Sequence, residues 1–104
     1  MDDLGKEYCK QVGKALRELR KEYTGKSLCM FAYENDVPRS TLSRIEIGEN
    51  EPQLVNLKKI AEGFGWSMSE LFSHIEEKMP KDFKIFDDGH YWFNFFWILI
   101  NNSI

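Results

Sequence analysis

The sequence holds few of the residues that build disulfide or metal frameworks. Cys9 and Cys29 are too few for a disulfide scaffold and lack the spacing of metal ligands, so we interpret both as reduced, small hydrophobic residues. His74 and His90 have no His, Cys or carboxylate partner at ligand spacing. We therefore expect no metal and no other cofactor.

A long hydrophobic run is also missing. The longest apolar stretch, residues 91–100, is interrupted by Asn94, and as a helix it would span about 15 Å, half of the roughly 30 Å of a bilayer core. The first residues, Met1, Asp2 and Asp3, are not those of a signal peptide. We expect a cytoplasmic protein that does not span a membrane.

Catalytic motifs are absent as well. No Ser or Cys lies in a recognisable nucleophile motif, and no Gly-rich phosphate loop follows a strand, so we expect neither an enzyme nor a small-molecule site. The 104 residues are 42% hydrophobic and 30% charged. This composition is typical of one soluble globular domain.

The sequence does show helical periodicity. Apolar residues recur every three or four positions in five segments, and no alternating strand pattern occurs before residue 80. Ser27 and Ser67 are good N-caps, while Gly25, Gly48 and Gly65 fit helix ends. The sequence therefore predicts an all-α, compact five-helix bundle with helices over about residues 4–23, 27–35, 38–47, 54–64 and 67–79.

Each predicted helix has an apolar stripe that should face a common core, because helices this short gain most of their stability from packing. The stripe residues are Leu4, Tyr8, Val12, Ala15, Leu16, Leu19, Tyr23, Leu28, Phe31, Ala32, Leu42, Ile45, Leu54, Leu57, Ile60, Ala61, Phe64, Leu71, Phe72, Ile75 and Met79.

The third helix, residues 38–47, has two chemically different faces. At about 100° per residue its polar residues share an arc of roughly 140°, opposite an apolar side that also carries Glu46. Two guanidinium groups and two small hydroxyls on one face suit phosphates and base edges. These polar residues are Arg39, Ser40, Ser43 and Arg44.

Two short helices joined by a three- or four-residue turn form a helix-turn-helix, whose second helix enters the major groove of DNA. Matching motifs follow one another along the chain: Ser27 and Leu28 with Phe31 and Ala32, then residues 37–46, Gly48 and Pro52, and Leu57 with Ile60 and Ala61. With these motifs, residues 12–72 resemble the Cro and phage-repressor-type (lambda-repressor-like) helix-turn-helix domain, also called the xenobiotic-response-element family.

The resemblance implies that Arg39, Ser40 and Arg44 contact bases, the same face that the helical wheel selects. Arginine offers a bidentate fork to guanine O6 and N7. We therefore expect sequence-specific binding to a double-stranded DNA operator, with guanine at one or two positions of each half-site.

Further residues are expected at the phosphates. The Thr41 and Ser43 hydroxyls would either hold a phosphate or bond back to a helix carbonyl. Lys26 would add a cation, and Asn50 and Gln53, before the fourth helix, would hold phosphates without charge.

Glu46 projects toward the apolar side of its helix, where a carboxylate requires a cationic partner. The resemblance implies a structural ion pair with an arginine near the end of the first helix. Arg20 is the matching residue, and Arg17, one turn earlier, is the alternative.

The charge balance is unfavourable for DNA binding. Residues 1–79 contain 12 Lys or Arg and 14 Asp or Glu, a net charge of −2. Leu28 stands where the family often has glutamine, and Ile47, Glu49 and Glu51 where it commonly has basic residues. We expect a shallow dependence of affinity on salt and a requirement for a homodimer.

Residues 80–104 form an aromatic extension to the predicted DNA-binding domain, residues 1–79. The runs 81–86 and 91–100 flank an Asp-Gly turn, which suggests a β-hairpin, although the second run fits a helix equally well. We favour a homodimer interface. Packing on the bundle, contact with a membrane surface or a partner, and an accidental extension of the reading frame are the alternatives.

The leading function is a transcriptional regulator that acts as a homodimer on a pseudo-palindromic site with half-sites about one helical turn apart. A phage-type repressor, a restriction–modification controller and an antitoxin all suit the size of the chain. The alternative is a protein-interaction module that kept the fold and lost most DNA affinity.

Overall fold

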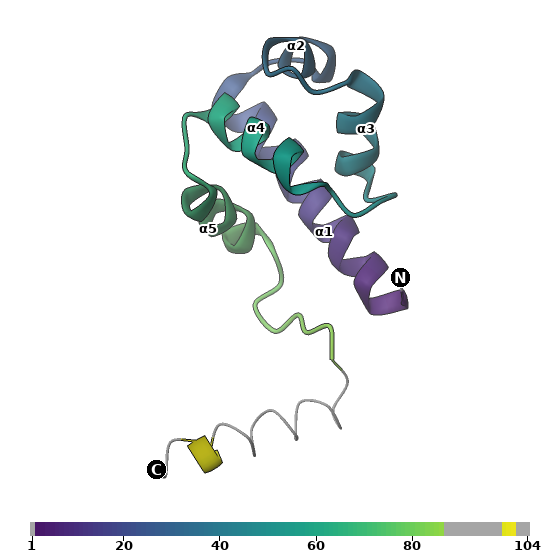
Figure 1. The fold of residues 1–104 in the computed structure, drawn as a ribbon, viewed down its shortest axis with the longest axis vertical. Helices are drawn as coiled ribbons and strands as arrows, with labels where there is room; N and C mark the ends of the chain where they lie inside the picture. Colours follow the sequence, from purple (N-terminus) through teal and green to yellow (C-terminus); the bar gives the residue numbers. More distant parts are fainter. Residues whose placement is uncertain (1, 87–98, 102–104) are drawn as a thin grey trace.

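The structure, a computed structural model, describes residues 2–86 and 99–101 (Figure 1). Between residues 3 and 78 it contains five α-helices and one π-helical segment, joined by short loops. The elements are α1 (Asp3–Leu19), η1 (Arg20–Thr24), α2 (Leu28–Glu34), α3 (Arg39–Ile47), α4 (Leu54–Phe64) and α5 (Met68–Lys78). The predicted all-α bundle is confirmed. None of the described helices is long and apolar enough to cross a membrane.

The predicted caps define several helix boundaries. Ser27 Oγ accepts a hydrogen bond from the Met30 amide at 3.1 Å at the start of α2. At the start of α5, Ser67 and Glu70 form a reciprocal capping box, with both bonds at 3.1 Å. These bonds satisfy amides that have no partner inside a helix, so the short helices begin at fixed positions.

The first helix ends earlier than predicted. Its α-helical part stops at Leu19, and Arg20–Thr24 form a π-helical turn. The Arg20 carbonyl accepts from the Gly25 amide, five residues on, at 3.2 Å and from the Thr24 hydroxyl at 2.6 Å. The hydroxyl and the left-handed Gly25 (φ 64°) thus close a wider turn than hydrophobic periodicity reveals.

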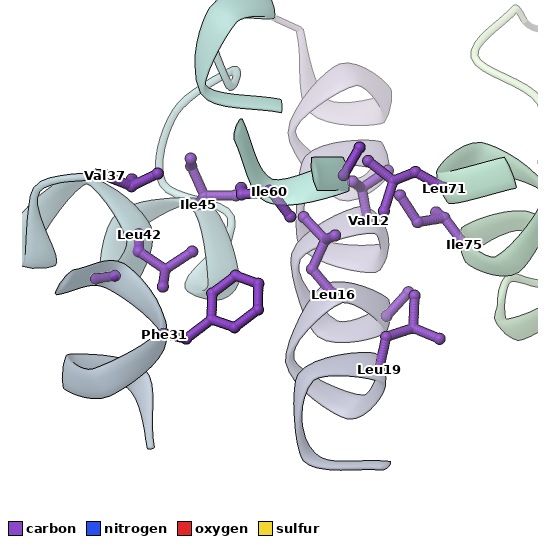
Figure 2. Close-up of a cluster of buried hydrophobic side chains, with 13 residues drawn as sticks. Val12, Leu16, Leu19, Phe31, Val37, Leu42, Ile45, Ile60, Leu71 and Ile75 are labelled. Atoms are coloured by element: carbon purple, nitrogen blue, oxygen red, sulfur yellow. The ribbon is translucent and has the colours of Figure 1, made fainter. Parts of the chain in front are cut away.

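The core lies where all five α-helices meet, and the side chains in Figure 2 point toward one another. Leu16 and Leu19 of α1 contribute to it, as do Phe31 of α2, Ile60 of α4 and Leu71 of α5, each with 2% or less of its surface exposed. Close packing of this kind supplies most of the stability of such short helices.

Three stripe predictions are wrong. Leu4 is 41% exposed and Leu54 is 72% exposed, because the first turns of α1 and α4 lie outside the core cluster. Tyr23, in η1, is 57% exposed and packs edge-on against Trp66, with ring centroids 5.0 Å apart. Five other stripe residues are partly buried and pack against the core: Tyr8, Leu28, Phe64, Phe72 and Met79.

The cysteines and the described histidine have different environments. Cys9 is buried, and this burial raises the pKa of its thiol, with a smaller contribution from the Glu51 carboxylate. Cys29 is exposed, since Phe31 and Ala32 are the residues that α2 buries. His74 is half-buried and stacks on Trp66 at 4.0 Å, while His90 lies outside the described residues.

The start of the C-terminal extension returns to the bundle. Residues 80–86 do not form the expected strand, and the Phe83 ring instead lies 6.0 Å from that of Tyr8 in α1. Residues 99–101 are helical. The Asp-Gly turn and most of the second apolar run lie outside the described residues.

Candidate nucleic-acid interface

α3 lies at one edge of the bundle, connected to α2 and on the side opposite α5 (Figure 1). Pro38 precedes it with φ −56°, and Gly48 follows it in the left-handed conformation. Leu42 and Ile45 are 1% and 4% exposed, so one face of α3 is anchored in the core. The opposite face is left for solvent.

α3 makes its closest contact with α1. A Cβ added at Gly13 would lie 2.2 Å from the Ile45 carbonyl oxygen and 2.6 Å from that of Glu46. One at Gly48, where φ is 76°, would lie 2.5 Å from the Lys10 Cα. Two glycines therefore let the backbones of α1 and of the end of α3 approach to direct contact.

A buried ion pair adds a second constraint on α3. Arg20 Nε lies 2.8 Å from Glu46 Oε2 and Arg20 Nη2 lies 2.9 Å from Glu46 Oε1, in the bidentate geometry that suits a guanidinium. Arg20 Nη1 also donates to the Lys26 carbonyl oxygen at 2.7 Å. The bond to Glu46 raises the pKa of Arg20. Of the two alternatives, Arg20 is the partner, since Arg17 is exposed.

The predicted reading residues lie on the outer side of α3. Arg39, Ser40 and Arg44 are exposed, and Thr41 and Ser43 are half-buried. Among the described residues, no ion pair involves the Arg39 side chain. The arrangement offers guanidinium and hydroxyl groups to a ligand along one helix face.

Four of the predicted contact residues surround one hollow of about 340 Å³ between α3 and the start of α4. Thr41 and Arg44 line it from α3, and Asn50 and Gln53 from the connecting loop and cap. Asn56, which the sequence analysis missed, also lines it. Asn56 follows Gln53 by three residues and therefore lies on the same helix face, a spacing that could have indicated it from the sequence.

Two acidic residues lie at the reading face, since Glu51 lines the hollow and Glu49 approaches Arg44. Glu49 Oε2 lies 3.8 Å from Arg44 Nε, and both side chains are 58% exposed. The carboxylate therefore competes with any anion for one of the two arginines of α3. An exposed pair of this kind is weak, at about 0–1 kcal/mol.

Lys26 is not brought to this hollow. Its ammonium pairs with Glu34 Oε2 across α2. Lys10, in contrast, lies beside the loop after α3 through its contact with Gly48. The described residues contain no group of three or more His, Cys, Asp or Glu side chains able to hold a metal ion.

The chain matches known proteins over this same region. A helix-turn-helix family model matches residues 6–71. The control protein C.MunI from Mycoplasma sp is 47% identical over 68 residues, which are 65% of this chain and 92% of that protein. The matched residues run from the first turn of α1 through α4 to the start of α5, and therefore include the whole candidate interface. The chain thus belongs to the Cro/repressor-type helix-turn-helix family of DNA-binding transcriptional regulators.

Proposed function

We propose that the protein reads a specific DNA operator by inserting α3 into the major groove, with Arg39, Ser40 and Arg44 at the base edges. The observation that carries this proposal is the exposed polar face of α3 on a helix fixed from behind. Arg20 and Glu46 pair at 2.8 Å behind that face, and Gly13 allows backbone contact with α1. A rigid helix holds its side chains in register with the bases.

The hollow beside α3 is the proposed phosphate site. Thr41, Asn50 and Gln53 line it with neutral donors and Arg44 with a guanidinium, beside the carboxylate of Glu51. α4 begins directly after Gln53, and the free amides of a helix N-terminus favour an anion. Ser43, which does not line this hollow, is proposed as a further neutral phosphate contact. Lys26 would contact a phosphate only after leaving Glu34.

We further propose that the protein acts as a homodimer on two half-sites. Residues 1–79 serve as the DNA-binding domain in this proposal, and residues 80–104 as the dimerisation extension. A single α3 with neutral phosphate contacts and a net charge of −2 over residues 1–79 gains little from phosphate neutralisation. A second copy doubles the contacts.

Among the regulator types, we favour the controller type. The basis is the 47% identity to a protein that is itself named a control protein. Repressor and antitoxin roles use the same chemistry at the DNA and differ in genetic context.

Selection of bound duplexes from a random DNA pool tests the proposed function. We expect enrichment of a pseudo-palindrome with guanine at one or two positions in each half-site. The absence of any enriched sequence would contradict the proposal. That outcome would favour a protein-interaction module, which the contact between Glu49 and Arg44 also fits.

A further inference from the structure

Tyr33 is an aromatic residue that the fold does not use. It lies in the last turn of α2 and is 85% exposed, more than any other large hydrophobic residue in the described part of the chain. No hydrogen bond or ring contact of its side chain occurs among the described residues. Tyr23 differs, because its ring packs against Trp66.

The position of Tyr33 relative to α3 distinguishes it from a scattered surface residue. Tyr33 and Arg39, the first residue of α3, line the same hollow of about 400 Å³. Ala32 and Val37, both almost completely buried, also line it. A phenol and a guanidinium from two successive helices thus face one open space with an apolar lining.

The charge at this hollow is compatible with DNA. Asp36 is its one acidic lining residue, and Lys59 Nζ lies 3.3 Å from the Asp36 carboxylate and 2.9 Å from its carbonyl oxygen. The Asp36 side chain is 97% exposed, so the lysine and the solvent together screen its charge. A phosphate near Tyr33 would therefore meet a neutral hydroxyl donor beside a screened acid.

Helix-turn-helix geometry determines what would lie over this hollow. The first residues of the second helix reach base edges, while the first helix crosses the sugar-phosphate backbone. In a complex with DNA, a side chain at the end of α2 and beside Arg39 would therefore lie between the major groove and the adjacent DNA backbone. Tyrosine hydroxyls are common phosphate donors, and an aromatic ring covers the apolar face of a deoxyribose.

We propose that Tyr33 is a DNA-positioning residue whose hydroxyl donates to the phosphate next to the base read by Arg39. Its ring covers the sugar of that nucleotide. The inference rests on the proposed function. In this proposal Tyr33 helps to fix the position of α3 along the duplex and does not contribute to the choice of base.

The test uses the full chain, the duplex enriched by the wild-type protein, and copies of that duplex with one neutral methylphosphonate at each backbone position in turn. We expect Tyr33→Phe to weaken binding about ten- to a hundredfold, the cost of one hydrogen bond to a charged acceptor. Base preferences and the melting temperature should not change. Tyr23→Phe, on a tyrosine away from the interface, should bind as wild type.

The backbone scan supplies a readout that a purely structural role would not move. One methylphosphonate position per half-site should weaken the wild type and leave Tyr33→Phe unaffected. Equal sensitivity of both proteins at every position would overturn the inference, as would a changed base preference in Tyr33→Phe. Arg39→Ala distinguishes failure of the proposed function from failure of the Tyr33 proposal. If Arg39→Ala binds as the wild type does, the proposed reading face is rejected. If Arg39→Ala binds more weakly while Tyr33→Phe binds as the wild type does, only the role of Tyr33 is rejected.

Discussion

At the scale of single residues, Arg20 and Glu46 connect three parts of the molecule. The arginine begins η1, the glutamate belongs to α3, and the third bond of the arginine reaches the carbonyl of Lys26 before α2. Their side chains are 7% and 4% exposed. Every remaining hydrogen-bond need of such a buried pair must be met, and no buried side-chain nitrogen or oxygen in the described residues lacks a partner.

Removing one member of this pair should therefore be costly. We expect Glu46→Ala and Arg20→Ala each to lower the free energy of unfolding by about 3–5 kcal/mol, because each leaves a buried charge without a partner. Urea denaturation measures the change. Glu34→Ala, which breaks the exposed pair with Lys26, should lose less than about 1 kcal/mol.

The double mutant completes the cycle. If the two residues act as a unit, Arg20→Ala combined with Glu46→Ala is no less stable than either single mutant. Additive losses would contradict the coupling.

Glu49 provides a second residue-scale prediction. Glu49→Gln should raise operator affinity about two- to fivefold, because Arg44 is released from the contact at 3.8 Å. Fluorescence anisotropy at two salt concentrations measures the effect. Glu77→Gln, an exposed residue of α5 with the same change in net charge, is the control. An equal gain in both variants would indicate long-range electrostatics and reject the role of the contact.

At the scale of elements, the direct contact of α1 with α3 determines where the reading face lies. It depends on Gly13, whose missing side chain leaves room for the Ile45 and Glu46 carbonyls. A methyl group at this point meets backbone, which yields less readily than a flexible side chain. α3 would have to move away from α1.

Gly13→Ala should accordingly destabilise the fold by about 1–3 kcal/mol, despite the higher helix propensity of alanine. It should also weaken operator binding by more than the population of unfolded protein accounts for. Gly25→Asn is the control, because asparagine tolerates the left-handed conformation and a Cβ added at Gly25 would have no atom within 4 Å apart from its chain neighbours. Its loss of unfolding free energy should be about 1 kcal/mol or less. A Gly13→Ala protein as stable as wild type would contradict the close contact.

The elements that were predictable from sequence are those with local signals. Ser27, Ser67 and Gly48 mark helix ends through chemistry within a few residues, and the structure has ends at these points. The π-helical turn depends on a bond between Gly25 and Arg20 that periodicity does not encode. The exposure of Leu54 likewise depends on where the core ends, which is a tertiary property.

The candidate site likewise has features that the sequence predicts and features that depend on tertiary structure. The outward direction of Arg39 and Arg44 follows from 3.6 residues per turn and from the burial of Leu42 and Ile45 on the other side. The pairing of Lys26 with Glu34 was not predictable, because it depends on side-chain choices among several exposed charges. The same holds for the position of Tyr33 beside Arg39, since the hollow between them is formed by two helices.

At the scale of the whole molecule, the net charge of −3 and the aromatic extension should determine how the protein associates. We expect the full chain to sediment with twice the 12.3 kDa mass of one chain, and a truncation after Pro80 to sediment as a monomer. Phe83 packs beside Tyr8, so the rest of the extension is the part proposed to reach the second copy. A monomer mass for both proteins would reject the dimer.

If α3 reads bases through its exposed arginines, the base preference of the protein should change in Arg44→Ala. On the enriched duplex and its single-base variants, we predict that Arg44→Ala loses discrimination at one guanine per half-site, worth about 1–3 kcal/mol, and keeps discrimination elsewhere. Arg17→Ala, an exposed arginine of α1, should keep the complete preference. An Arg44→Ala protein with the wild-type base preference at every position would show that Arg44 does not read a base.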